Sequence, residues 1–289
     1  MGTIRQIRRL TLFEAAILIG LLLLAAFMSL PIVFIINHAF KPFHELFLFP
    51  PTFLVKEPTL GNFYELFARP AARVVPFSRY LYNSIVVSAL AMVAVILSSC
   101  MAAYVLSKLA FSLKKVVMAL IMLALMYAAE TVSIPRYLII GWLHMNNTYF
   151  GHILPVVASP VAVFLIKQFI DQIPDSLLEA AKIDGASEVR TFVRIVIPLA
   201  MPAIATISII TFQGVWGDTS ASTLFMQNEA MKTLPYYIMT LASATSAGNT
   251  VAGQGMAAAA GLLMFLPNLI VFLVAQRRIM ETMAHSGVK

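Results

Sequence analysis

The sequence predicts an all-α integral membrane protein with six transmembrane helices and both termini in the cytoplasm. Apolar residue types make up 60% of the 289 residues and charged types only 11%, whereas a soluble domain carries about 25% charged residues. The mean hydropathy is +0.88. One soluble core cannot bury so much apolar side chain, so lipid must surround most of it. The composition therefore excludes an ordinary soluble domain, a disordered chain and a disulfide-stapled secreted module.

Six runs of the chain reach the roughly 20 mostly apolar residues that a membrane span needs. We expect these spans at Leu10–Phe40, Tyr82–Leu106, Val116–Leu143, His152–Phe169, Leu199–Phe225 and Gly253–Gln276. The first run follows Arg5, Arg8 and Arg9 as a signal peptide would. It is too long for one and lacks a clear cleavage site, so we expect an uncleaved membrane anchor.

The distribution of basic residues predicts the orientation of these spans. Most of the 20 Lys and Arg lie at the N terminus, in the segments after the second and fourth spans, and in the C-terminal tail. Such an excess marks the cytoplasmic side, and an even number of spans puts both termini there. The net charge of +7 is not gathered into a basic face with interleaved aromatic residues, so nucleic-acid binding is not expected.

Along the chain we expect three parts. Residues 1–80 hold the first span and an outer-face segment, residues 81–278 a five-helix transmembrane domain, and residues 279–289 a cytoplasmic tail. The outer segment from Lys41 to Arg79 is rich in proline, which argues against a long helix there. It is either a simple connector or a contact for an external partner.

The segment 171–198, between the fourth and fifth spans, carries a dense set of helix signals. Ser176 and Glu179 have the spacing of a capping box after Pro174, so a helix should begin there. Gly185 is suited to end it, because glycine accepts the left-handed backbone of a helix end. These signals predict an ordered cytoplasmic segment.

A second short helix should follow in the same segment. Ser187 is suited to cap it, with Glu188 in its first turn, where the helix dipole favours an anion. Its apolar residues recur at helical spacing and should share one face: Val189, Phe192, Val193 and Val196. Two short helices with small residues between them make either a structured connector or a docking element that a partner can approach closely.

The same segment resembles the signature of permease subunits of binding-protein-dependent ATP-binding-cassette importers. That signature is Glu-Ala-Ala, three residues, Gly, nine residues, Ile, one residue and Leu-Pro. Here it reads Glu179-Ala180-Ala181, Gly185, Ile195 and Ile197-Pro198, with Ile197 in the place of leucine. The chain is similar in particular to the maltose-type second permease of sugar importers, including those for alginate or other oligosaccharides. Supporting stretches are Asn83-Ser84, Ala102–Ser107, Asn146–Tyr149 and Glu281–Gly287.

The resemblance implies a subunit of the bacterial inner membrane that works with several partners. These are a second homologous permease, a dimer of ATPase subunits, an external solute-binding protein, membrane lipid and a sugar. ATP and Mg belong to the ATPase, and this chain, which has no glycine-rich phosphate loop, needs no cofactor and is not an enzyme. The two-helix loop would sit in a cleft of the ATPase, whose closure on ATP would switch the spans from inward-facing to outward-facing.

The resemblance also assigns roles within that loop. Glu179 would be the charged contact to the ATPase, Gly185 would allow the turn, and Arg190 and Arg194 would pair with acidic groups of the ATPase. The remaining residues assigned to this coupling contact are Ala180, Ala181 and Asp184.

Polar residues within the expected spans are candidates for the solute pathway. A charge at mid-membrane costs at least ~2.5 kcal/mol unless it has a partner or faces water. Glu130 and Arg136 are six residues apart, a poor spacing for an ion pair within one helix, so each is either structural or a substrate contact. Gln213, Trp216 and Asp218 combine an aromatic face with hydroxyl-binding groups, which suits sugar passage, although small neighbours also suit helix packing.

Other classes of function find little support in the sequence. A membrane enzyme would need a catalytic set, and no Ser-His-Asp, Cys-His or His-Glu arrangement is visible. The five histidines are dispersed, so no metal site is expected. An ion-coupled transporter would need internal repeats and broken spans that face each other. A permease for a non-sugar solute remains the main alternative, because the binding protein normally selects the solute.

Overall fold

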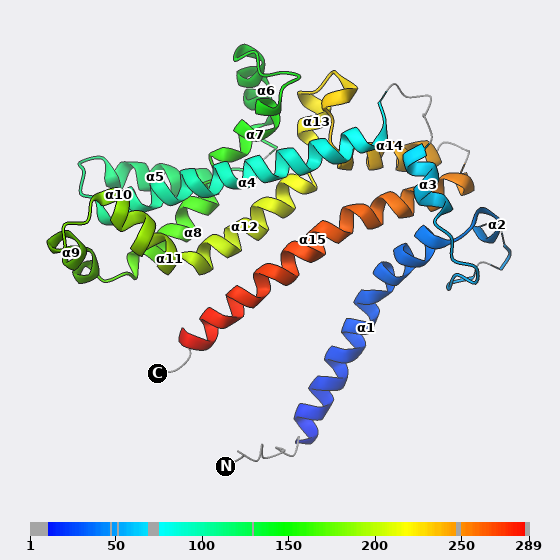
Figure 1. The fold of residues 1–289 in the computed structure, drawn as a ribbon, viewed down its shortest axis with the longest axis horizontal. Coiled ribbons are helices and arrows are strands. Elements are labelled where there is room, and N and C mark those ends of the chain that lie inside the picture. Colours follow the sequence, from blue (N-terminus) through cyan, green and yellow to red (C-terminus); the bar gives the residue numbers. More distant parts are fainter. Residues whose placement is uncertain are drawn as a thin grey trace. The chain divides into compact units, whose positions relative to one another are not determined.

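The computed structural model describes residues 11–46, 48–50, 52–68, 75–128, 130–246 and 250–286, with side chains omitted at 244–246, 250–252, 275 and 277–286. Every regular element in these ranges is helical (Figure 1). In order they are α1 (Leu12–Phe40), α2 (Phe43–Leu46), α3 (Gly61–Ala68), α4 (Phe77–Lys108), α5 (Lys114–Leu125), α6 (Ser133–Trp142), α7 (Tyr149–Val157), α8 (Pro160–Asp171), α9 (Asp175–Ile183), α10 (Glu188–Thr191), η1 (Phe192–Val196), α11 (Ile197–Leu199), α12 (Met201–Trp216), α13 (Ser220–Leu224), η2 (Glu229–Met231), α14 (Leu234–Ser246) and α15 (Thr250–Ser286).

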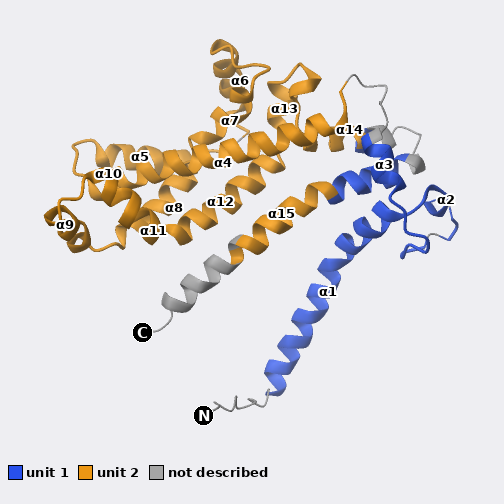
Figure 2. Ribbon diagram, viewed as in Figure 1, with its two compact units in different colours: residues 1–68, 242–262 blue, residues 69–241, 263–289 orange. Residues whose placement is uncertain are grey.

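The chain divides into two compact units, coloured separately in Figure 2. Unit 1 comprises residues 1–68 and 242–262, and unit 2 comprises residues 69–241 and 263–289. The expected division into 1–80, 81–278 and 279–289 stays a prediction, since the units follow packing rather than membrane topology. Arg5, Arg8 and Arg9, on which the orientation partly rests, lie outside the described residues, as does the last part of the tail.

Three helices are long and apolar enough to cross a membrane by themselves. They are α1, α4 and the segment Gly253–Val274 of α15, with mean hydropathies of 2.8, 2.5 and 2.3. Two helix pairs are bent at a short break: α7 with α8, by 45°, and Glu188–Leu199 with Met201–Leu224, by 76°. If each bent pair is counted as one span, there are two further spans. The described residues thus hold three to five spans, and the sixth expected span stays a prediction.

The expected third span, Val116–Leu143, is not one continuous helix. It contains α5 and α6, with turns between them. Pro135 lies in the first turn of α6, where its missing N–H removes no helical hydrogen bond. Glu130 therefore lies in the turn before α6, not within a helix, and its place within a membrane span stays a prediction.

Unit 2 is built on the packing of α4 against α8 and α12. Small side chains at the contact let the backbones approach closely, as is typical of helices in lipid: Ala91, Ala103, Ala162 and Ala203 are at most 1% exposed. Larger residues fill the remaining space, among them Val95, Ile166 and Ile207. Another face of α4 exposes Leu90 and Leu97, apolar surface that suits a lipid environment.

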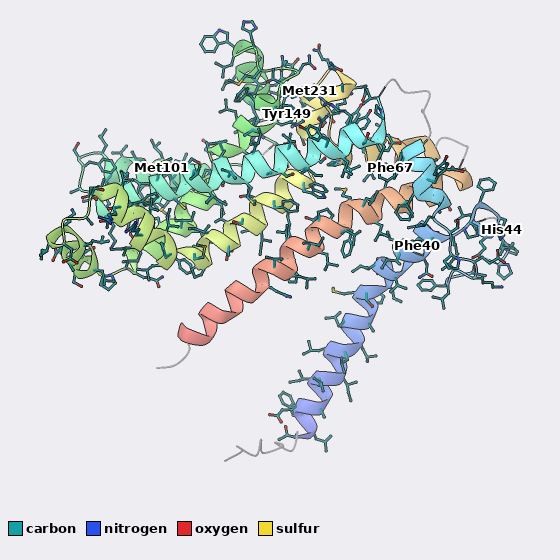
Figure 3. All side chains as sticks on the ribbon, in the orientation of Figure 1. Phe40, His44, Phe67, Met101, Tyr149 and Met231 are labelled. Atoms are coloured by element: carbon teal, nitrogen blue, oxygen red, sulfur yellow. The ribbon has the colours of Figure 1, made fainter. Side chains whose placement is uncertain are left out.

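One end of unit 2 is held together by a buried amide, Asn83 of α4. Its side-chain N–H groups donate to the carbonyls of Ala230 and Lys232, both at 2.8 Å, and its oxygen accepts a bond of 2.9 Å from the Tyr149 hydroxyl. Figure 3 labels Tyr149 on α7 and Met231 on η2 at this end. Loss of such a partner leaves a buried group unsatisfied at a cost of about 1–3 kcal/mol.

Asn147 and Ser84 bond the backbone of the same end of unit 2. The Asn147 side-chain oxygen accepts N–H groups of Gln227 and Asn228 at 2.7 and 2.8 Å, and the Ser84 hydroxyl accepts the N–H of Leu234 at 2.8 Å. The sequence stretches Asn83-Ser84 and Asn146–Tyr149 therefore meet in space and fix the connection from α13 to α14.

Candidate functional site

The other end of unit 2 carries the two-helix element, called here the knob (residues 175–199: α9, α10, η1 and α11). Its first helix begins at Asp175, as the sequence predicts. The expected capping box is wrong, because Pro174 occupies the cap position and no side chain caps the helix. Ser176 is thus already inside the first turn. Asp175 takes the favourable place for an anion near the helix N-terminus.

Gly185 ends α9 as predicted. Its φ of +78° is the left-handed conformation that glycine adopts without strain. The N–H of Gly185 bonds the carbonyl of Lys182 at 3.0 Å, and that of Ala186 bonds the carbonyl of Ala181 at 2.9 Å. This pair of bonds is a Schellman motif, so the turn between the two helices is a defined structure.

Ser187 caps the second helix, again as predicted, by accepting the N–H of Arg190 at 3.3 Å. The expected apolar face is wrong in part. Phe192 and Val196 face the protein, whereas Val189 is 72% and Val193 51% exposed. The second half of this stretch is the π-helical turn η1, where the N–H of Ile197 bonds the carbonyl of Phe192. The wider turn changes which side chains share a face.

The knob is fixed to the end of α4 by a nearly buried lysine. The Lys108 side chain is 8% exposed, and its ammonium donates to the carbonyl of Ile173 at 2.5 Å and the carboxylate of Asp175 at 2.8 Å. Beside it, Asp171 at the end of α8 accepts bonds from Ser107 at 2.6 Å and Lys167 at 2.5 Å. These bonds join α4, α8 and the start of α9.

A second link joins α4 to the other helix of the knob. The Tyr104 hydroxyl donates to the Glu188 carboxylate at 2.7 Å, and the ammonium of Lys182 lies 2.8 Å from the other oxygen of Glu188. The hydrogen bond and negative charge of Glu188 raise the pKa of Lys182 above its ordinary value. The Tyr104 ring also contacts that of Phe192, with centroids 5.3 Å apart. Glu188 thereby connects α4, α9 and α10.

Most residues assigned to the coupling contact are exposed on the knob: Glu179, Ala180, Asp184, Gly185, Arg190 and Arg194. Ala181 is only 7% exposed, so its side chain faces this protein and not a partner. Ile183 is 87% exposed, although the sequence analysis did not assign it to the coupling contact. Its place immediately before the helix cap was the one signal that could have indicated an outward position.

A cavity of about 610 Å³ lies elsewhere in unit 2, lined by the turn before α6 and by α6, α7, α8, α12 and α13. Three of the predicted pathway residues line it: Glu130, Arg136 and Asp218. Among the described residues neither Glu130 nor Arg136 has an ion-pair partner, in accord with their spacing in the sequence. The sequence did not single out His152, which lines the same cavity and whose ring bonds the carbonyl of Met231 at 3.0 Å.

The other two predicted pathway residues do not line this cavity. Trp216 is 2% exposed, and its indole N–H donates to the carbonyl of Met264 at 2.8 Å. Its ring stacks on Phe212, so its contacts are those of helix packing. Gln213 is exposed away from the cavity lining. Asp218 also has a local role, since its carboxylate accepts the N–H groups of Ser220 and Ala221 at 2.9 and 3.0 Å.

Known proteins are similar to this chain in sequence and in fold. Residues 19–278 match the family of binding-protein-dependent transport system inner membrane components. The chain belongs to this family. It is therefore an inner-membrane component of a transport system, as the signature in the knob indicated.

Individual relatives cover most of the chain. The Escherichia coli (strain K12) inner membrane ABC transporter permease protein YcjP is 29% identical over 96% of this chain and 98% of its own length. The sn-glycerol-3-phosphate transport system permease protein UgpE of Pectobacterium atrosepticum is 32% identical over 81% of this chain and 82% of its own. A solved bacterial ABC transporter involved in the import of the acidic polysaccharide alginate has the same fold, with a TM-score of 0.78 at 21% identity, over 96% of this chain and 99% of that one.

The link through Tyr104 predicts a local effect of removing one hydroxyl. Tyr104→Phe should weaken the second helix of the knob by about 1 kcal/mol, because Glu188 loses a hydrogen bond. Hydrogen exchange of the membrane-embedded protein should then be faster at the N–H groups of residues 190–194. Tyr127→Phe is the matched control, since Tyr127 is 60% exposed. Equal exchange in the two variants would contradict the link.

Proposed function

We propose that the chain is the permease subunit of an ATP-driven importer that moves a sugar or oligosaccharide across the inner membrane by alternating access. Its partners are a second homologous permease, a dimer of ATPase subunits and an external solute-binding protein. The knob receives the movement of the ATPase and passes it to the spans. The observation that carries this proposal is an ordered knob with an exposed surface, attached to α4 at two points.

The exposed surface of the knob suits a protein partner better than water or lipid. Ile183 and Val189 are 87% and 72% exposed, yet charged residues flank both of them in the sequence. Apolar side chains among charges are unfavourable in water and badly placed for lipid, whereas a protein cleft accommodates both. Glu179 on the same element supplies a charge for pairing. We infer that this partner is the ATPase, because similar proteins are permeases of ABC transporters.

The attachment to α4 explains how movement of the knob would reach the spans. The knob bonds α4 through Lys108 and through Tyr104, and α4 packs along α8 and α12. A displacement at the ATPase would therefore move the packed helices together instead of bending the loop alone. Such rigid-body movement of a helix group is the usual way in which a central site is opened to alternate sides.

The lining of the cavity suits a polar solute, but it does not by itself identify that solute as a sugar. Glu130, Arg136 and Asp218 supply charged groups, with serine and threonine hydroxyls in the same lining. Hydroxyl-rich and acidic solutes fit such groups. Alginate and sn-glycerol-3-phosphate, named for two of the similar proteins, are of this kind. A phosphorylated polyol, rather than a sugar, is the second candidate, favoured by the 32% identity to a glycerol-3-phosphate permease.

Charge reversal at Glu179 tests the coupling role. Glu179→Arg should leave the chain in the membrane, because the residue is exposed and outside the packed core, but should reduce co-purification of the ATPase and abolish solute-stimulated ATP hydrolysis. Lys115→Glu, at an exposed position near the start of α5, is a charge-reversal control that should retain both. Full transport and stimulated hydrolysis in the Glu179 variant would refute the proposed docking role.

Removal of the Arg136 side chain tests the solute route. Arg136→Ala should lower the rate of solute uptake by about tenfold or more, because a hydrogen bond to a charged group contributes about 1.5–3 kcal/mol. Subunit assembly and basal ATP hydrolysis should persist. Gln213→Ala, outside the cavity lining, should transport normally. The opposite pattern, with uptake lost in the Gln213 variant alone, would move the route away from the cavity.

A further inference from the structure

The segment that follows α1 in unit 1 has an inverted polarity. Two of its charged residues are buried, with Lys41 2% and Glu45 3% exposed, whereas Phe49 is 95% and Leu54 63% exposed. A loop in water is expected to show the reverse arrangement. Residues 48–50 and 52–55, called here the hook, carry this exposed apolar surface.

The buried polar side chains satisfy the irregular backbone of this segment. The Glu45 carboxylate accepts the N–H groups of Lys56, at 3.1 Å, and Glu57, at 2.8 Å. The Asn37 side chain accepts the N–H of Val55 at 3.0 Å, and the Lys41 ammonium donates to the carbonyl of Thr52. Irregular backbone placed in an apolar medium needs such internal partners, because water is not there to supply them.

The hook folds back along the flank of α1. Val55 bonds Asn37, and the ring of Phe53 lies 6.3 Å from that of Phe34. Phe34 precedes the end of α1 at Phe40 by six residues, which is about 9 Å along a helix. The segment is drawn beside this end of α1 in Figure 3, where Phe40 and His44 are labelled. The hook therefore returns to the level of the last turns of the span.

We expect the boundary of the hydrocarbon region at that level, because the apolar part of α1 ends there. The charge-free, mostly apolar part of α1 that follows Glu14 ends at Ile36, directly before Asn37 and His38. The most apolar window of α1 is 0% buried within this chain, so the other described segments leave it uncovered, and the exposed side chains of the hook continue that apolar surface. The opposite, polar side of the segment carries the exposed pair His44 and Glu57, 3.7 Å apart.

We propose that the hook is a membrane anchor, which inserts Phe49, Phe53 and Leu54 among the acyl chains of the leaflet at the C-terminal end of α1. Burial of these side chains in the acyl–headgroup boundary removes their apolar surface from water. The hook thereby fixes the depth at which α1 ends. This inference needs only the membrane location of α1 and is independent of the proposed solute and of ATPase coupling.

Spin-label accessibility tests the anchor in the assembled transporter in lipid nanodiscs. Cys100, the single cysteine, is removed as Cys100→Ser, and a nitroxide is attached after Phe49→Cys. We expect collisions with oxygen, which concentrates in the acyl region, to exceed collisions with a water-soluble nickel chelate. The matched control, Glu57→Cys in the same background, should give the reverse ratio.

Two results would overturn the proposal. A label at position 49 that collides mainly with the nickel chelate would place the hook in water. A label with low access to both reagents would place the hook under a protein partner instead of lipid. A second label after Leu54→Cys keeps the test informative if the first variant does not assemble, and the same oxygen preference is expected there.

Discussion

The ammonium group of Lys108 lies at the junction of α4 and the knob, where it bonds the Ile173 carbonyl and the Asp175 carboxylate at once. A charge with only 8% of its side chain exposed needs such partners. In return, it ties the end of α4 to the entry of α9. The Tyr104–Glu188 bond attaches the second helix to the same side of α4. Both helices of the knob are therefore bonded to α4, the helix that forms the centre of unit 2.

The same physical rule operates at three irregular parts of the molecule. Lys108 holds the knob, Asn83 holds the connection from α13 to α14, and Glu45 holds the segment after α1. Each is a buried polar side chain that bonds backbone groups which helices elsewhere satisfy internally. Backbone groups that are buried away from water outside regular helices need such protein partners. The breaks between helices are thus specified by a few polar residues.

The sequence predicted the helical class, the long spans and the turn of the knob, because these depend on local signals. Gly185 and Ser187 act as expected, since a left-handed helix end and a serine cap need only their own neighbours. The π-helical turn at η1 and the entry through Pro174 were not predicted. Phe192 and Val196 of the π-helical turn pack with residues of α4, α8 and α12, and such contacts between distant segments cannot be read from local sequence signals.

The pathway residues were predicted less well, for a related reason. Trp216 has the right chemistry for a sugar but is used for packing, with its N–H bonded to Met264. Glu130 in the turn before α6, Arg136 in α6 and Asp218 in the turn after α12 are brought to one cavity, a convergence that spacing along the chain does not reveal. Similarly, the stretch Ala102–Ser107 marked the family, but only the structure shows that Tyr104 within it bonds the knob.

The attachment of the knob to α4 is tested most directly by an intramolecular distance in the assembled transporter. Spin labels at the exposed Leu177 on the knob and at the exposed Met101 on α4, in a Cys100→Ser background, report this distance by double electron–electron resonance. The distance distribution should be the same without nucleotide and with ATP bound, because knob and helix move as one body. A shift on ATP binding would show that the knob moves relative to α4, and would contradict the account of how it drives the spans.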